Sequence, residues 1–138
     1  LATPSIDDAS GVLTVSYTSD NNGSATITVQ ANDDNGSTLD ESFIVTVTAV
    51  DDAPTVSSAI SDQTVNEDDS NTTIDLSSVF TDVDNDNSSI SKAVQANTNT
   101  GLVSASISGN TLTLDYQADQ NGSATITIRG TSNGLTVD

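Results

Sequence analysis

Asn22-Gly23-Ser24-Ala25-Thr26-Ile27-Thr28-Val29 recurs almost unchanged as Asn121-Gly122-Ser123-Ala124-Thr125-Ile126-Thr127-Ile128, 99 positions further along the chain. The likeness extends to both sides in two more aligned pairs: residues 12–17 with 111–116, and residues 35–40 with 133–138 after a one-residue deletion. Similarity at one fixed spacing is typical of tandem structural repeats. The sequence therefore predicts parts of two successive repeats, each roughly a hundred residues long.

Apolar and polar residues alternate through most of both repeats, which is the pattern of half-buried β-strands. Clusters of Asn, Asp and Gly separate the alternating runs and mark turns, and no window has helical periodicity. In the second repeat we expect seven strands: residues 55–65, 72–76, 90–95, 102–107, 111–116, 123–129, and one that begins at 135. Short strands at this spacing predict an all-β fold, an antiparallel two-sheet β-sandwich.

The repeat boundaries divide the chain into three parts. Residues 1–50 correspond to the C-terminal half of one repeat, residues 51–54 to an acidic linker, and residues 55–138 to the next repeat without most of its last strand. Pro54 stiffens the linker because its ring fixes φ. Incomplete repeats expose unpaired strand edges. We therefore expect completion by the chain's continuation or by strand donation between copies, and otherwise disorder over residues 1–50 or self-association.

Composition excludes several classes of function. The 138 residues contain 20 Asp and Glu but 2 Lys and Arg, which gives a formal net charge of −18. Such a charge opposes binding to nucleic acid and to anionic membranes, and no apolar run is long enough to span a membrane. Without His or Cys, and with its acids at loop ends, the chain is not expected to be an enzyme.

The acidic residues gather at loops that we expect at the ends of the sandwiches. In Thr81-Asp82-Val83-Asp84-Asn85-Asp86-Asn87 the carboxylates occupy alternate positions, a pattern that can direct them at one Ca²⁺ ion. If successive strands reverse direction, Asp20, Asp51, Asp52, Asp82, Asp84 and Asp86 meet at the junction between the repeats. Glu67, Asp68 and Asp119 then face the following junction, and Asp33 and Asp34 face the preceding one. The alternative is a solvated acidic surface without a bound cation.

Four motifs carry a resemblance to a known family. They are Val50-Asp51-Asp52-Ala53-Pro54, Val65-Asn66-Glu67-Asp68, Phe80-Thr81-Asp82-Val83-Asp84 and Ala31-Asn32-Asp33-Asp34-Asn35-Gly36. With them, nearly the whole chain resembles the cadherin-like, immunoglobulin-like tandem repeats of large bacterial surface adhesins. The resemblance implies Ca²⁺ between successive domains, with Asp51, Asp52, Asp82 and Asp84 as ligands and Glu67 serving the next junction. It also implies an extracellular location at the cell surface.

Two classes of function remain open. The first is a calcium-stabilised structural repeat that acts as a rod-like spacer in cell adhesion, with neighbouring repeats of the same chain as its partners. The second is an adhesive module that binds glycan or protein, or a fibre subunit completed by strand donation from other copies. Glycan sites usually expose aromatic side chains, and an aromatic content of 3% therefore favours the spacer.

Overall fold

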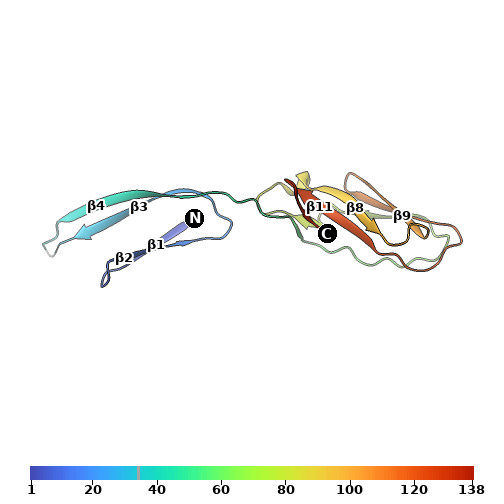
Figure 1. The fold of residues 1–138 in the computed structure, drawn as a ribbon, viewed down its shortest axis with the longest axis horizontal. Helices are drawn as coiled ribbons and strands as arrows, with labels where there is room; N and C mark the ends of the chain where they lie inside the picture. Colours follow the sequence, from blue (N-terminus) through green and yellow to red (C-terminus); the bar gives the residue numbers. More distant parts are fainter. Residues whose placement is uncertain (34) are drawn as a thin grey trace. The chain divides into compact units, whose positions relative to one another are not determined.

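The computed structural model describes residues 1–33 and 35–138, and the fold is all-β with antiparallel sheets (Figure 1). The described residues form two compact units, Leu1–Val50 and Asp51–Asp138. Asp51 and Asp52 therefore belong to the second unit. Within the described residues the helical content is a single 3₁₀ turn, η1 (Asn87–Ser89), and no helix there could cross a membrane.

The first unit consists of two hairpins, each a two-stranded antiparallel sheet. Strands β1 (Ala2–Asp7) and β2 (Val12–Tyr17) form one hairpin, and β3 (Gly23–Asn32) and β4 (Thr38–Val47) form the other. The second hairpin is paired over its whole length, from Gly23 opposite Val47 to Asn32 opposite Thr38. Among the described residues of this unit, Ile27 alone is buried.

The second unit contains two three-stranded antiparallel sheets, in the orders β6-β10-β9 and β12-β11-β8, and the short pair β5-β7. Its strands are β5 (Thr55–Val56), β6 (Thr72–Asp75), β7 (Phe80–Thr81), β8 (Ser91–Asn97), β9 (Val103–Ser108), β10 (Thr111–Tyr116), β11 (Ile126–Ser132) and β12 (Leu135–Val137).

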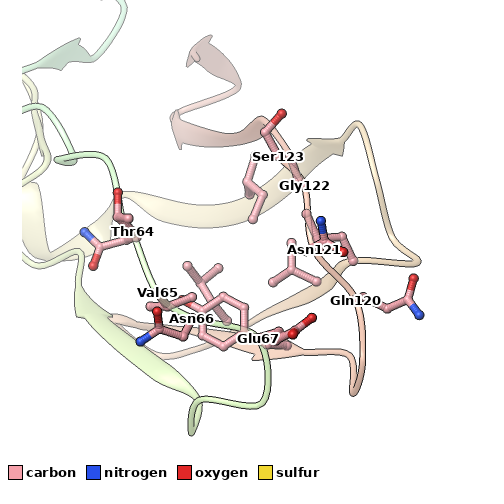
Figure 2. Close-up of a pocket in the computed structure, with 15 residues that line it drawn as sticks. Thr64, Val65, Asn66, Glu67, Gln120, Asn121, Gly122 and Ser123 are labelled. Atoms are coloured by element: carbon pink, nitrogen blue, oxygen red, sulfur yellow. The ribbon is translucent and has the colours of Figure 1, made fainter.

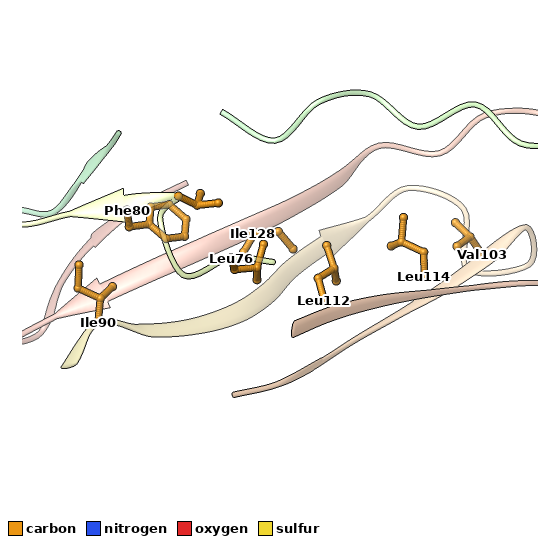
Figure 3. Packing of buried hydrophobic residues seen from close by; sticks show 8 residues of the cluster. Leu76, Phe80, Ile90, Val103, Leu112, Leu114 and Ile128 are labelled. Atoms are coloured by element: carbon orange, nitrogen blue, oxygen red, sulfur yellow. The ribbon is translucent and has the colours of Figure 1, made fainter. Parts of the chain in front are cut away.

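One hydrophobic cluster joins both sheets of the second unit (Figure 3). Leu112 and Leu114 of β10 enter it from the first sheet, and Ile128 of β11 enters it from the second. Leu76, which is fully buried, and Phe80 come from the segment between β6 and β8. The apolar side of each alternating strand therefore faces a shared core, as the sequence pattern predicts.

The same turn recurs in both units, so the sequence repeat is also a structural one. Asp20 and its counterpart Asp119 have φ of 60° and 58°, a left-handed conformation that Asp tolerates. A backbone hydrogen bond from Thr18 to Leu1 (3.2 Å) recurs as one from Gln117 to Leu102 (2.9 Å).

Two predicted strands of the second unit are shorter than expected. The run 55–65 forms a strand only over β5, because the amides of Ser57 and Ser58 both donate to the Val79 carbonyl and the chain bends there. The run 123–129 is a strand only from Ile126 onward. The acidic motif of residues 81–87 begins at the last residue of β7 and ends at the first residue of η1.

Candidate functional site

The acidic loop of residues 81–87 is closed by its own side chains. Asn87 Oδ1 accepts hydrogen bonds from the Asp82 amide at 2.8 Å and from Thr81 Oγ1 at 3.2 Å. Asp82 Oδ1 accepts from the amides of Asp84 and Asn85, both at 2.9 Å. Asp and Asn favour such local turns because their short side chains reach nearby backbone amides.

The first residues of the second unit are bonded to this loop. The Asp52 amide donates to Asp84 Oδ2 at 2.8 Å, and Asn85 Nδ2 donates to Asp51 Oδ1 at 2.8 Å. Asn133, in the turn after β11, donates to Asp51 Oδ2 at 3.1 Å. Both carboxylate oxygens of Asp51 thus accept from side-chain amides, which offset part of its negative charge.

Asp82 is the buried member of the loop, with 8% of its surface exposed. Asp82 Oδ2 and Ser132 Oγ are buried atoms, and neither makes a hydrogen bond of standard geometry. The nearby Ser132 hydroxyl nevertheless does most to lower the pKa of Asp82. The amides of Asp84 and Asn85 also lower the pKa, whereas burial opposes the shift. The carboxylate is therefore ionised at neutral pH, and its Oδ2 makes no hydrogen bond of standard geometry although the Ser132 hydroxyl is nearby.

The other predicted ligands take no part in this hydrogen-bonded group around Asp51, Asp82 and Asp84 in the described structure. Asp86 caps η1, and its Oδ1 accepts from the Ser88 amide at 2.8 Å, which lowers the pKa of Asp86. Asp20 belongs to the first unit, as does Asp33, whose Oδ1 accepts from the amides of Asn35 and Ser37 at 2.9 and 2.8 Å. Asp34 lies outside the described residues.

A second acidic region brings together two distant loops of the second unit. Asp68 Oδ1 accepts a 3.0 Å hydrogen bond from the Asp119 amide. Both residues have positive φ, 69° and 58°. Glu67 lies beside Asp68 in the sequence and lines a cavity between these loops.

The donor chemistry of the acidic loop suits a hard cation, but its ligand set is incomplete. Within the described residues, no three acidic side chains form a group that could hold a metal ion. The oxygens of Asp51 and one oxygen each of Asp82 and Asp84 already accept hydrogen bonds. Asp82 Oδ2 makes no hydrogen bond of standard geometry, and carboxylate and amide oxygens are the ligands that Ca²⁺ prefers.

Three polar residues of this site were not predicted from the sequence: Asn85, Ser132 and Asn133. Asn85 lies inside the acidic motif but has no charge, and Asn133 precedes a glycine and resembles a simple turn residue. Ser132 is the last residue of β11 and is 3% exposed. Its burial near Asp82 is a feature of the structure, and no signal in the sequence points to it.

Comparison of the chain with protein-family models, with curated proteins and with solved structures finds no match.

Proposed function

We propose that the chain is a structural repeat of an extracellular, rod-like surface adhesin, built from immunoglobulin-like or cadherin-like sandwich units in tandem, and that Ca²⁺ stabilises it. The internal repeat, the antiparallel sheets and the acidic motifs support this proposal. The low aromatic content and the absence of His and Cys favour a spacer over a glycan-binding module or an enzyme.

The observation that carries the calcium proposal is Asp82 Oδ2, a buried carboxylate oxygen that makes no hydrogen bond of standard geometry, in the loop that also holds Asp84 and that Asn85 joins to Asp51. In the described structure no three acidic side chains lie close enough together to hold a metal ion, so Asp51, Asp82 and Asp84 would supply oxygens to the cation only after the loop closes further around it. Ca²⁺ would neutralise the negative charge that the Asn85 and Asn133 amides offset only in part. Since two carboxylates about 4 Å apart repel by roughly 4 kcal/mol near a protein surface, neutralisation favours the closed loop.

Thermal unfolding with Ca²⁺ and with chelator tests the calcium site. A ligand that binds only the folded state at a hundredfold excess over its dissociation constant stabilises that state by about 2.7 kcal/mol. We expect a higher melting temperature in millimolar Ca²⁺, and a smaller rise in Mg²⁺, which keeps its waters and demands octahedral geometry.

The double variant Asp82→Asn/Asp84→Asn should lose most of the calcium-induced rise, whatever its melting temperature in chelator. The matched control is Asp62→Asn, an exposed carboxylate of the same unit, which should keep the full rise. Identical melting curves with Ca²⁺ and chelator would refute the calcium site and leave the loop as a solvated acidic surface.

The spacer role is tested separately in a protein with two complete repeats. Small-angle scattering should give a larger maximum dimension in Ca²⁺ than in chelator, because neutralised carboxylates no longer repel at the junction. An unchanged scattering curve would show that Ca²⁺ does not stiffen the repeats.

A further inference from the structure

Asn133-Gly134 is the turn that joins β11 to β12. Ser132 lies opposite Leu135 in the register of the two strands, so the turn consists of these two residues alone. Their φ values of 44° and 89° are left-handed, as a hairpin turn of this length requires, and Asn followed by Gly adopts such values most readily. Both residues are exposed, so the turn is accessible to water.

An asparagine followed by glycine is also a reactive pair, because glycine has no Cβ to hinder attack by its backbone nitrogen. In this turn the Gly134 nitrogen would lose its proton to hydroxide and form a bond to Asn133 Cγ, while the bond from Cγ to Nδ2 breaks and ammonia leaves. Water then opens the five-membered imide at either carbonyl. The products are aspartate and isoaspartate, and each has exchanged a neutral amide for a carboxylate.

The structure leaves the nucleophile free and restrains the side chain that it would attack. Within the described residues, the Gly134 amide donates no hydrogen bond. Asn133 Nδ2 donates to Asp51 Oδ2 at 3.1 Å. To reach the Gly134 nitrogen, the carboxamide must turn away from Asp51. The hydrogen bond to Asp51 is therefore the restraint that opposes ring closure.

Three other Asn-Gly pairs occur in the chain, at residues 22–23, 35–36 and 121–122. In the counterpart pair 35–36 the nucleophile is engaged, since the Gly36 amide donates to the Asp33 carbonyl at 3.0 Å. The pair 121–122 lines a cavity of the second unit (Figure 2). Of the four asparagines, and within the described part of the chain, Asn133 alone has a hydrogen-bonded carboxamide. A carboxylate that holds the reacting group thus distinguishes this pair.

We propose that Asn133 is a site of spontaneous deamidation, and that its hydrogen bond to Asp51 holds the reaction back while the acidic loop of residues 81–87 is closed. Conversion replaces a donor with a carboxylate that faces Asp51, so repulsion takes the place of the hydrogen bond. Ammonia is lost, and the change therefore does not reverse. The turn contains a one-way charge switch. This inference needs only the contact between Asn133 and Asp51 and does not depend on Ca²⁺ binding.

Trypsin isolates the site, because the chain has one Lys and one Arg, Lys92 and Arg129, and the peptide of residues 130–138 contains Asn133 as its one asparagine. Liquid chromatography with mass spectrometry separates the asparagine, aspartate and isoaspartate forms of this peptide. The wild-type chain is incubated with chelator at mildly alkaline pH, either folded or unfolded in urea. We expect conversion to be about tenfold slower in the folded chain, since a hydrogen bond to a charged group restrains the side chain to that degree.

Asp51→Ala removes the acceptor and should raise the rate in the folded chain about tenfold. Asn85→Ala is the matched control, because it removes another hydrogen bond to Asp51 and keeps the one from Asn133. Its rate should stay at the wild-type value. Melting curves establish that both variants are folded during incubation. In urea all three chains should convert at the same rate.

Four results would overturn the proposal. Absence of conversion in urea would show that Asn133 is not a deamidation site, and equal rates in the folded and unfolded wild type would show that folding does not protect it. This comparison needs no variant, so it holds even if Asp51→Ala fails to fold. Equal rates in the folded wild type and folded Asp51→Ala would exclude the hydrogen bond as the cause. Equal acceleration by Asp51→Ala and Asn85→Ala would assign the protection to the loop as a whole and not to this contact.

Discussion

The side-chain amide of Asn133 donates a 3.1 Å hydrogen bond to Asp51 Oδ2, and so joins the turn after β11 to the first residue of the second unit. Asn85 binds the other oxygen of Asp51 from the acidic loop. Two neutral amides therefore hold a carboxylate in place in a strongly acidic region. A negative charge at position 133 would face Asp51 and should therefore destabilise the acidic loop of residues 81–87.

Asn133→Asp should destabilise the second unit by about 1–3 kcal/mol in chelator, because a donor becomes a like charge that faces Asp51. The backbone is not the cause, since Asp tolerates the φ of 44° at this position. Urea unfolding at low salt measures the loss. Asn35→Asp, at the counterpart position in the first unit, adds the same charge and should leave the unfolding transition of the second unit unchanged. Equal effects of the two variants would contradict the prediction.

Gly130→Ala should destabilise the second unit by about 1–3 kcal/mol through overpacking. A Cβ at this position would lie 2.8 Å from Phe80 Cγ, a buried ring that cannot move away freely. Gly101→Ala is the matched control, since its nearest neighbour would be Asn99 Oδ1 at 3.6 Å. If the ring contact is the cause, Gly130→Ala should cost less in a Phe80→Leu background, and a double-mutant cycle from chemical denaturation measures this coupling.

Local patterns predicted the strands well where one face is buried. β10 has the expected bounds of residues 111–116, because Leu112 and Leu114 alternate with polar residues around a real core. The prediction was wrong for residues 55–65, where the alternation continues but the backbone partners change at Ser57. It was also wrong for the start of β11, because a strand needs a neighbour as well as a pattern, and residues 123–125 have an unpaired edge.

The candidate site was predictable only in part. The acidic motif was found from the spacing of its carboxylates and Asp51 from the expected reversal of successive strands, and the structure joins them by hydrogen bonds. Asn133 was missed because it lies 82 positions from Asp51, and only the pairing of β11 and β12 places their turn there. The role of Ser132 depends on burial beside Asp82, which a single sequence does not reveal.

Monovalent salt should raise the melting temperature of the wild-type chain even without a divalent cation. Its carboxylates far outnumber its two basic side chains, and raising NaCl from 0.01 to 1 M shortens the Debye length from about 30 to about 3 Å. Scanning calorimetry over this range measures the effect. Millimolar Ca²⁺ at constant ionic strength should add a further rise. If Ca²⁺ adds nothing beyond ionic strength, its effect is screening and not binding.

The loss of unfolding free energy at acid pH should depend in part on Asp82. Its pKa in the folded state lies below the ordinary 3.8, chiefly because of the Ser132 hydroxyl. A carboxyl whose pKa is lowered by folding contributes stability that is complete above about pH 5 and is lost as pH falls through the folded-state pKa. The stability difference between wild type and Asp82→Asn should therefore be constant from pH 7 to about pH 5 and shift against the wild type below about pH 4.

Ser132→Ala provides the matched test of this cause, since it removes the hydroxyl and keeps the carboxylate. The pKa of Asp82 should then rise towards its ordinary value, and the pH-dependent part of the difference from Asp82→Asn should shrink. Asp7, Asp75 and Asp86 also have lowered pKa values, so comparison between variants is needed to isolate Asp82. Urea unfolding at a series of pH values from 7 to about 3 gives the curves. If the free energies of unfolding of wild type and Asp82→Asn fall in parallel as pH is lowered, folding leaves the pKa of Asp82 unchanged. If the difference grows in favour of the wild type on acidification, burial raises the pKa of Asp82.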